Sequence, residues 1–339
     1  MNFLENPALL LAIAALLDFL IGDPWNWLHP VQVMGWAIGR YGRWVQTWLA
    51  LTPEPASVQR KVGLQRTAGV LLAIALVLGS GASGWLIVHA SRTVHPLLGL
   101  AAESILLASC FAGRSLRDAA ADVLQPLSRG DLSEARSHLS RYVGRDTENL
   151  PEPEILRAVL ETVTENATDG VTAPLFWAIA GSFIPLGPIP LALGYKAAST
   201  LDSMVGYKAA PYTHLGWASA RLDDLLTWLP CRLTVLTIAL ISGRPGHVLK
   251  LCRRDAPQDP SPNAGWSECA YAAALDVQVG GQNTYRGKIT HKPLLADPVR
   301  PITSERIQQA LNLTRRVFLL WLAGAIALHH LSCLRPLLS

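Results

Sequence analysis

One continuous apolar stretch, about residues 68–90, limits what this chain can fold into more than any other feature. A helix of about 20 apolar residues crosses the hydrocarbon core of a bilayer. Arg60, Lys61 and Arg66 precede the stretch and Arg92 follows it, so polar flanks bound it on both sides. Only 16% of the 339 residues are charged, whereas soluble domains carry about 25%. The sequence therefore predicts a membrane protein.

Other apolar stretches are candidate spans at about residues 7–21, 94–111 and 317–331. Residues 172–198 carry PLGPIP at their middle. Proline lacks a backbone donor and blocks the preceding helical turn, so a proline-interrupted hairpin of two half-length helices fits better than one span. Residues 225–242 could also cross, although Pro230 and Arg232 lie inside them. We expect an all-α polytopic membrane protein.

The charged residues indicate whether the chain binds nucleic acid and which side of the membrane its polar segments face. A formal charge of +4, from 29 basic and 25 acidic residues, is too small for a nucleic-acid-binding surface. Basic residues favour the cytoplasmic side of a membrane, and segments 22–66 and 243–316 hold more basic than acidic residues. These two segments are therefore expected in the cytoplasm, and no nucleic-acid partner is expected.

An acidic segment follows residue 144. Proline near its start and asparagine and glycine residues near its end predict a helix over about residues 152–166. Carboxylates four and eight residues apart share one helical face, and like charges so placed are unfavourable in an isolated helix. Oxygen ligands of this kind suit Mg²⁺ carried in with a nucleotide, and a solvated acidic face is the alternative. The candidate metal ligands are Glu161, Glu165, Asn166 and Asp169.

Two more segments place polar residues beside apolar sequence, where an uncompensated charge costs several kcal/mol. Such residues are either functional or held in structural ion pairs. The first segment holds Asp202, Lys208, Arg221, Asp223 and Asp224. The second has turn residues and a glycine-rich stretch, expected to form a flexible loop whose backbone amides could hold phosphate. It holds Asn263, Trp266, Asn283, Tyr285 and Arg286.

Several strings of the sequence occur together in one order and spacing. They read GDP and HPVQVMG near the N-terminus, then GRDT, the acidic helix with TAPLFW, LDSMVGYK, GWASARLDD, SPNAGW and GGQNTY. In this combination the chain resembles the adenosylcobinamide-phosphate synthases of cobalamin biosynthesis, the CobD/CbiB family. The resemblance extends from about Leu10 to Leu313.

The resemblance implies an ATP- and Mg²⁺-dependent ligase that forms an amide. The free propionate of adenosylcobyric acid, a corrinoid, would be joined to (R)-1-aminopropan-2-ol or its O-phosphate, giving adenosylcobinamide or its phosphate. A carboxylate is a poor electrophile, so phosphorylation to an acyl phosphate would precede attack by the amine. Implied partners are these substrates, the lipid bilayer and other cobalamin-assembly enzymes.

Within that reaction we assign residues by their chemistry. Glu161, Glu165, Asn166 and Asp169 would bind the Mg²⁺–nucleotide, and Glu165, Asp202, Asp223 and Asp224 would be catalytic, as metal ligands or as a base. Lys208, Arg221 and Arg286 would contact phosphate. Asn263, Trp266, Asn283 and Tyr285 would line the corrin side.

The expected organisation is one membrane-embedded catalytic domain over residues 1–316 and a C-terminal membrane helix and tail over 317–339. It would lie in the inner membrane of a bacterial cell, with its site facing the cytoplasm. Polar segments at about 22–66, 114–171, 195–225 and 243–316 would form the site. A transporter or a sensor for a corrin or anion is the alternative, but the sequence shows no repeated halves.

Overall fold

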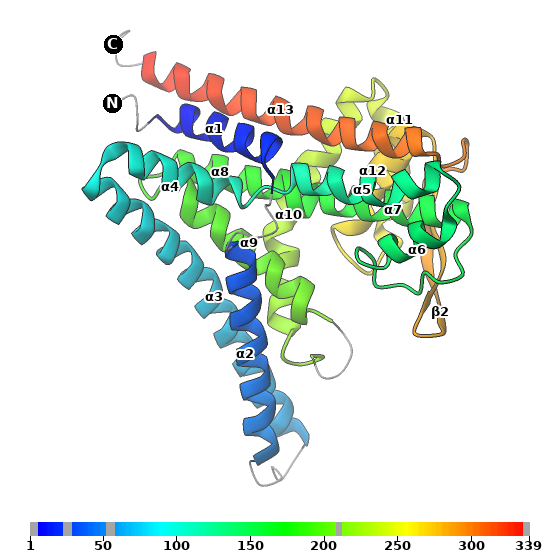
Figure 1. Cartoon of the computed structure of the whole chain (residues 1–339), viewed down its shortest axis with the longest axis horizontal. Helices are drawn as coiled ribbons and strands as arrows, with labels where there is room; N and C mark the ends of the chain where they lie inside the picture. Colours follow the sequence, from blue (N-terminus) through cyan, green and yellow to red (C-terminus); the bar gives the residue numbers. More distant parts are fainter. Residues whose placement is uncertain (1–5, 23–28, 52–57, 208–211, 335–339) are drawn as a thin grey trace. The chain divides into compact units, whose positions relative to one another are not determined.

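The computed structural model describes residues 6–22, 29–51, 58–207 and 212–334 (Figure 1). The chain forms two compact units, each assembled from separate stretches of sequence. Unit 1 comprises Met1–Phe111, Pro174–Leu226 and Leu322–Ser339, and unit 2 comprises Ala112–Ala173 and Thr227–Trp321. Membership of residues 1–316 in one catalytic domain stays a prediction.

Most of the described chain is helical, as predicted. The first helices of unit 1 are α1 (Pro7–Leu20), α2 (Pro30–Leu51), α3 (Val58–Val94) and α4 (Pro96–Ala108). Unit 1 also contains α9 (Pro188–Val205) and α8 (Ala173–Ser182), except for Ala173, the first residue of α8. Two long helices, α10 (Trp217–Ile241) and α13 (Ser304–Leu334), contribute residues to both units.

Three helices in the described residues are long and apolar enough to cross a membrane. These spans are Gln59–Val94, Trp217–Ile241 and Ser304–Ser332. The second is continuous through Pro230, so the ambiguous stretch at 225–242 is part of one helix. Pro7–Leu20 is a shorter apolar helix, and Pro96–Ala108 passes the test only together with Gly113–Ser128, across a 41° bend.

The proline-rich stretch is divided into two helices, α8 and α9, with a break between Ser182 and Pro188, whereas their pairing as a hairpin stays a prediction. Gly187 takes φ +82° in this break, a backbone conformation that favours glycine. Helix α9 also packs closely against α3, because a Cβ on Gly81 would lie 2.9 Å from the carbonyl oxygen of Pro190. Small residues permit such close approach of membrane helices.

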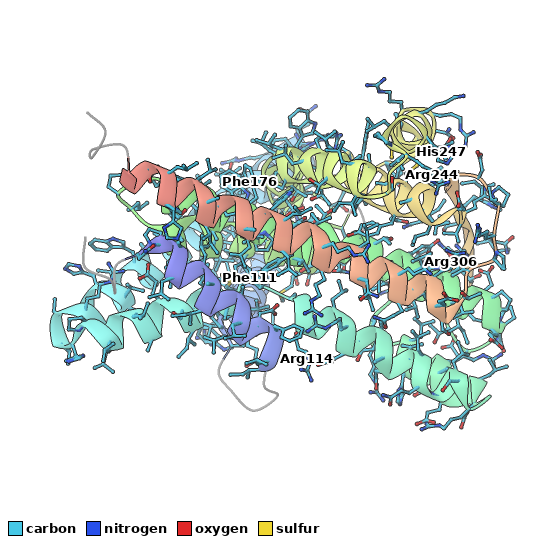
Figure 2. The ribbon with its side chains drawn as sticks, turned by 90° about the horizontal axis from the view of Figure 1, so that it is seen from above. Phe111, Arg114, Phe176, Arg244, His247 and Arg306 are labelled. Atoms are coloured by element: carbon cyan, nitrogen blue, oxygen red, sulfur yellow. The ribbon has the colours of Figure 1, made fainter. Side chains whose placement is uncertain are left out.

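Unit 2 surrounds α7 (Glu152–Asn166), whose bounds match the predicted helix. The helix continues without interruption into a π-helix (Ala167–Thr172). Helices α5, α6 and α12 and strand β1 contact α7, and helix α11 contacts α12. Figure 2 shows Arg244 and His247 at the start of α11, where both are exposed. The further elements are α5 (Gly113–Ser128), α6 (Leu132–Leu139), α11 (Pro245–Asp255), α12 (Ala264–Leu275), β1 (Val279–Tyr285) and β2 (Lys288–Leu295).

The glycine-rich stretch is not the flexible loop that the sequence predicts. Strands β1 and β2 form an antiparallel hairpin, and its turn places Arg286 at φ 51° and Gly287 at φ 76°. Positive φ at both central residues is typical of the turns that close two-residue hairpins. The amides of Arg286 and Gly287 each donate to the carboxylate of Asp146, both over 2.8 Å. These turn amides are thus already bonded to a carboxylate of the protein.

Candidate functional site

The acidic face of α7 lies in the interior of unit 2. Pro151 precedes the helix, and the first turn carries Glu152 and Glu154, where carboxylates complement the helix dipole. Glu161 and Glu165, one turn apart, share one face of the helix. Helix α12 and the β-hairpin pack against α7. Two neighbouring groups of charged side chains result, one around arginines and one around a lysine.

The first group, here called the arginine cluster, consists of Arg145, Glu154, Arg157, Glu161 and Asn283. Glu161 is 1% exposed. Arg157 donates to one of its oxygens over 2.9 Å, and Arg145 donates to the other. The backbone amide of Gly280 also donates to Glu161, over 2.8 Å. The Glu161 carboxylate is therefore neutralised by two cations and fixed to the hairpin.

Arg157 joins α7 to strand β1. It donates to the carbonyl oxygens of Gly280 and Gln282, over 2.7 and 2.8 Å, and to Asn283 Oδ1 over 3.0 Å. Burial alone would raise the pKa of Glu161, but the charges of Arg145 and Arg157 outweigh it and lower that pKa. Glu161 is thus ionised and held in an ion-pair network.

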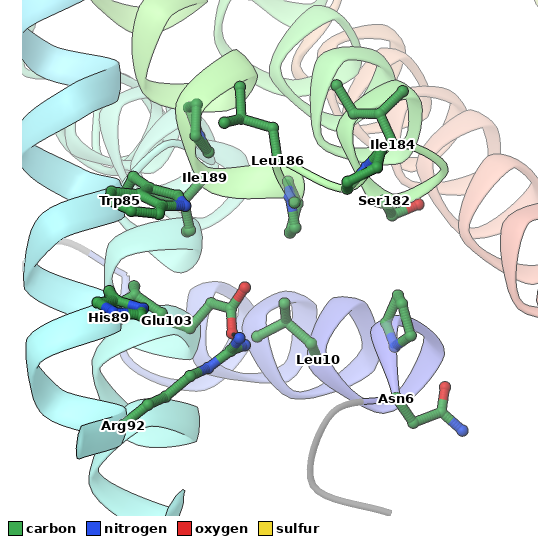
Figure 3. Close-up of a pocket in the computed structure, with 16 residues that line it drawn as sticks. Asn6, Leu10, Trp85, His89, Arg92, Glu103, Ser182, Ile184, Leu186 and Ile189 are labelled. Carbon is green, nitrogen blue, oxygen red and sulfur yellow. Dashed lines mark hydrogen bonds and ion pairs between the residues drawn. The ribbon is translucent and has the colours of Figure 1, made fainter. Parts of the chain in front are cut away.

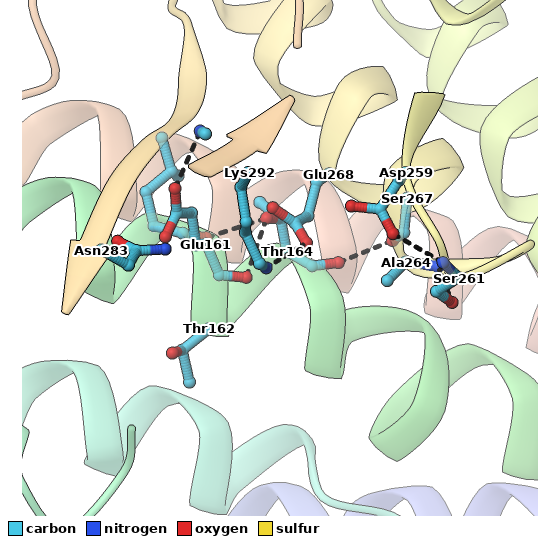
Figure 4. A network of polar contacts seen from close by, with 12 residues as sticks. Glu161, Thr162, Thr164, Asp259, Ser261, Ala264, Ser267, Glu268, Asn283 and Lys292 are labelled. Atoms are coloured by element: carbon cyan, nitrogen blue, oxygen red, sulfur yellow. Dashed lines mark hydrogen bonds and ion pairs between the residues drawn. The ribbon is translucent and has the colours of Figure 1, made fainter. Parts of the chain in front are cut away.

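The second group, here called the lysine cluster, consists of Glu165, Asp259, Glu268 and Lys292. Figure 4 shows the last three of these with Glu161 and Asn283 alongside. Glu268 is 1% exposed and lies on α12. Its Oε1 is 3.6 Å from Lys292 Nζ. Asp259 accepts a hydrogen bond from the backbone amide of Ser261 over 2.8 Å. Three carboxylates here share one lysine, so negative charge is in excess.

This excess, together with burial, shifts the pKa values of the cluster. Burial raises the pKa of Glu268 to about 8; Lys292 opposes the rise, and Glu165 and Glu161 add to it. Burial also raises the pKa of Glu165, against the opposing charge of Lys292. Burial would lower the pKa of Lys292, but the surrounding carboxylates raise it instead. The lysine cluster therefore holds a cationic lysine and two glutamates, Glu165 and Glu268, whose raised pKa values favour the protonated form.

Two buried polar atoms beside these clusters have no hydrogen-bond partner among the described residues. They are Glu268 Oε1 and Asn283 Nδ2. Figure 4 shows the amide nitrogen of Asn283 turned toward the carboxylates of the network. Buried polar groups are nearly always hydrogen-bonded, so an exception calls for a functional explanation or a bound molecule.

The structure brings only some of the predicted site residues of unit 2 together. Glu161, Glu165 and Asn283 meet at the two clusters. Asn166 instead is exposed and donates to the Thr162 carbonyl over 2.9 Å. Asp169 is half-buried in the π-helix, and Tyr285 and Arg286 lie at the hairpin turn.

Asn263 and Trp266 lie at the start of α12. Asn263 is buried, and its carbonyl accepts a bond from the Cys231 thiol over 3.3 Å. The Arg232 guanidinium lies 4.3 Å from the ring centroid of Trp266. Such a distance is typical of a cation–π contact.

The remaining predicted residues belong to unit 1. Asp223 is buried and Asp202 is half-buried. Arg221, which is exposed, approaches Asp224 at 3.8 Å, a spacing of three residues on α10. This is one of the structural ion pairs that the sequence left open. Lys208 lies outside the described residues.

Sequence reasoning missed Arg145, Asp259, Glu268 and Lys292. Glu268 carried a usable signal, because it is the only charged residue in the otherwise apolar helix AGWSECAYAAAL. A helix that is apolar all round is a buried helix, so its single carboxylate had to be buried too. Lys292 gave no such signal, since only the register of the hairpin places it opposite Gly281.

Fold and site together define a helical membrane protein with a buried, acid-rich cluster outside its apolar spans. The model of the CobD/CbiB protein family matches residues 11–314. The chain therefore belongs to the CobD/CbiB family. No solved structure matches the chain.

Curated relatives agree over most of the chain. A protein from Synechocystis sp. named cobalamin biosynthesis protein CobD is 50% identical over 315 residues, which is 92% of this chain and 88% of the relative. A CobD of Geobacter metallireducens is 45% identical over 85% of this chain and 86% of its own. The cobalamin biosynthesis protein CbiB of Salmonella typhimurium is 38% identical over 93% of each chain.

Proposed function

We propose that this protein is a carbon–nitrogen ligase of cobalamin biosynthesis. It would use ATP to join the free propionate of adenosylcobyric acid to (R)-1-aminopropan-2-ol or its O-phosphate, in the inner membrane of a bacterial cell with the site facing the cytoplasm. Family membership supports the pathway. The observation that carries the chemistry is Glu268, a buried carboxylate beside Lys292 with an oxygen that accepts no hydrogen bond from the part of the chain that the structure describes.

The residues present fit Mg²⁺ that arrives with ATP. In the described residues, no group of three or more His, Cys, Asp or Glu side chains is arranged to hold a metal ion. Mg²⁺ bound with a nucleotide usually needs only one or two protein carboxylates, because phosphates and water supply the other ligands. Glu165 is the candidate ligand for Mg²⁺, since the carboxyl groups around it outnumber the single lysine, Lys292, that could balance their charge. Glu161 is already committed to two arginines.

Amide formation also requires a proton acceptor. An amine that attacks an activated carboxyl group must arrive as, or become, the neutral amine, and the amide nitrogen finally loses one proton to a base. We assign this role to Glu268, because its raised pKa makes it a stronger base once ionised and its buried oxygen can then accept a hydrogen bond from an incoming ammonium group. Lys292 would then stabilise the phosphate or the oxyanion that develops during the displacement.

A reconstituted reaction tests the function. Purified protein in detergent would receive adenosylcobyric acid, ATP and Mg²⁺, with aminopropanol in one sample and its O-phosphate in another. We expect a corrinoid product whose mass has risen by one amine minus one water, and only when ATP is present. No mass increase with either amine would contradict the proposal.

The site assignment has its own test. Glu165→Gln should abolish turnover while the protein elutes as a folded species in detergent. Asn166→Ala is the matched control on the same helix, because this side chain is exposed and bonds only to the helix backbone in the structure. Near-normal turnover of Glu165→Gln would remove this carboxylate from the mechanism.

A further inference from the structure

Unit 1 contains a polar cavity next to an apolar groove. The cavity has a volume of about 180 Å³, and its wall includes Arg92, Glu103, His89 and Ser182. The groove has a volume of about 520 Å³ and is lined by α3, α8 and α9. Both are lined by Trp85, Leu186 and Pro190, so the two spaces are neighbours. Together they form one amphipathic site.

An ion pair forms the polar end. Arg92 donates to Glu103, and Figure 3 shows these two side chains reaching toward each other at the cavity. The side chain of Glu103 is 7% exposed, whereas that of Arg92 is 40% exposed. Arginine has five N–H donors, so Arg92 can bond a further acceptor while it contacts Glu103. One cation and one anion match a ligand that also carries both charges.

The pair lies near one end of the long apolar helix α3. Arg92 lies near the end of the candidate span Gln59–Val94. The groove residues Val77 to Trp85 lie 7 to 15 positions earlier, which is about 10–22 Å along the helix axis. One leaflet contributes about half of a hydrocarbon core of about 30 Å. Arg92 is the first charged residue after the apolar stretch, so we assign the polar end to headgroup depth and the groove to the depth of acyl chains.

We propose that this site binds a phospholipid with an ethanolamine headgroup, its ammonium on Glu103, its phosphate on Arg92 and an acyl chain in the groove. A primary ammonium donates hydrogen bonds to a carboxylate, which a choline headgroup cannot do. An anionic headgroup would meet no excess positive charge. A free amino-alcohol phosphate shares the headgroup chemistry, but it would leave the apolar groove unused.

Lipid retention tests the proposal. Delipidated protein would be mixed with ethanolamine, choline and glycerol phospholipids of identical acyl chains, and bound lipid would be counted by native mass spectrometry. We expect wild type to retain the ethanolamine lipid about tenfold better than the choline lipid. Equal retention would overturn the proposal, and so would displacement of the lipid by free aminopropanol phosphate.

A paired variant separates binding from folding. Arg92→Leu combined with Glu103→Leu removes both charges at once, so no buried charge is left alone. This variant should remain monodisperse and lose the preference for ethanolamine. Arg60→Gln, an exposed arginine at the other end of α3, should keep it. If the double variant still prefers the ethanolamine lipid, the proposed lipid site is wrong, whatever the ligase assay shows.

Discussion

The arginine cluster and the lysine cluster place the same kind of side chain in opposite electrostatic settings. Glu161 lies between two arginines, which lower its pKa. Glu268, at the neighbouring cluster, is equally buried but faces one lysine and other carboxylates, and its pKa rises to about 8. A matched ion-pair network favours a fixed structure, whereas an excess of buried carboxyl groups favours binding of a cation or a proton.

The largest effect is expected from breaking the arginine cluster. Arg157→Met removes the cation that joins Glu161 to the carbonyls of Gly280 and Gln282. Glu161 keeps Arg145, but removing one partner from a buried ion pair costs up to about 3–5 kcal/mol, and the bonds of Arg157 to the two carbonyls are lost as well. Thermal unfolding in detergent should show a strongly lowered midpoint or no folded protein.

The matched control is Arg114→Met, which breaks an exposed pair with Asp118 on α5. Exposed pairs contribute at most about 1 kcal/mol, so this midpoint should hardly change. If Arg157→Met unfolds at the wild-type temperature, the arginine cluster does not stabilise the fold.

A smaller effect, on turnover, is expected at the lysine cluster. Lys292→Met removes the cation beside Glu268, and we expect kcat for amide formation to fall about 100-fold, or about 2.7 kcal/mol in activation free energy. Lys288→Met, an exposed lysine on the same strand, is the control and should keep normal turnover. Equal activities of the two variants would contradict a role for Lys292.

The pH dependence of stability separates the clusters further. The folded pKa of Glu268, about 8, lies above its ordinary value of 4.5. Between these values the folded state retains a proton that the unfolded state has lost, so stability falls as pH rises from about 4.5 to 8. Relative to wild type, Glu268→Gln should therefore melt progressively higher as pH increases, by a few degrees. A constant difference between pH 5 and 8 would contradict the raised pKa.

The smallest effect is expected at the hairpin turn, away from both clusters. Asp146→Ala removes the acceptor of the Arg286 and Gly287 amides. Water can replace these exposed hydrogen bonds, so the free energy of unfolding should fall by only about 1 kcal/mol. Hydrogen exchange should rise at the turn while the strand amides near Asn283 and Lys292 stay protected. Loss of protection along both strands would show that Asp146 anchors the whole hairpin.

Sequence reasoning succeeded where a pattern is local. The helix over 152–166 was predictable because proline, acidic first-turn residues and asparagine mark its ends. The break between α8 and α9 followed from PLGPIP, since proline cannot continue a helix. Both features depend on neighbours in the chain, which the sequence displays directly.

Sequence reasoning failed where distant segments meet. Spacing alone places Glu161 and Glu165 on one face of the helix. In the structure, two arginines form ion pairs with Glu161, and one of them, Arg145, lies sixteen residues earlier in the chain. Gly280, Gly281 and Gly287 favour a flexible loop in the sequence, whereas the strand register that makes this segment a hairpin is a tertiary feature. Lys292 could be assigned to the cluster only from that register.

The most direct test compares Glu161→Gln with Glu268→Gln, measuring the melting midpoint and the turnover per folded molecule for each. We expect opposite results for the two variants. Glu161→Gln should lose stability, because two arginines lose their anion, yet retain near-normal turnover. Glu268→Gln should fold at least as well as wild type at pH 8 but lose about 100-fold or more in turnover, as expected for removal of a general base. If Glu268→Gln keeps wild-type turnover, or Glu161→Gln alone abolishes it, the division of the two clusters into structural and catalytic is wrong.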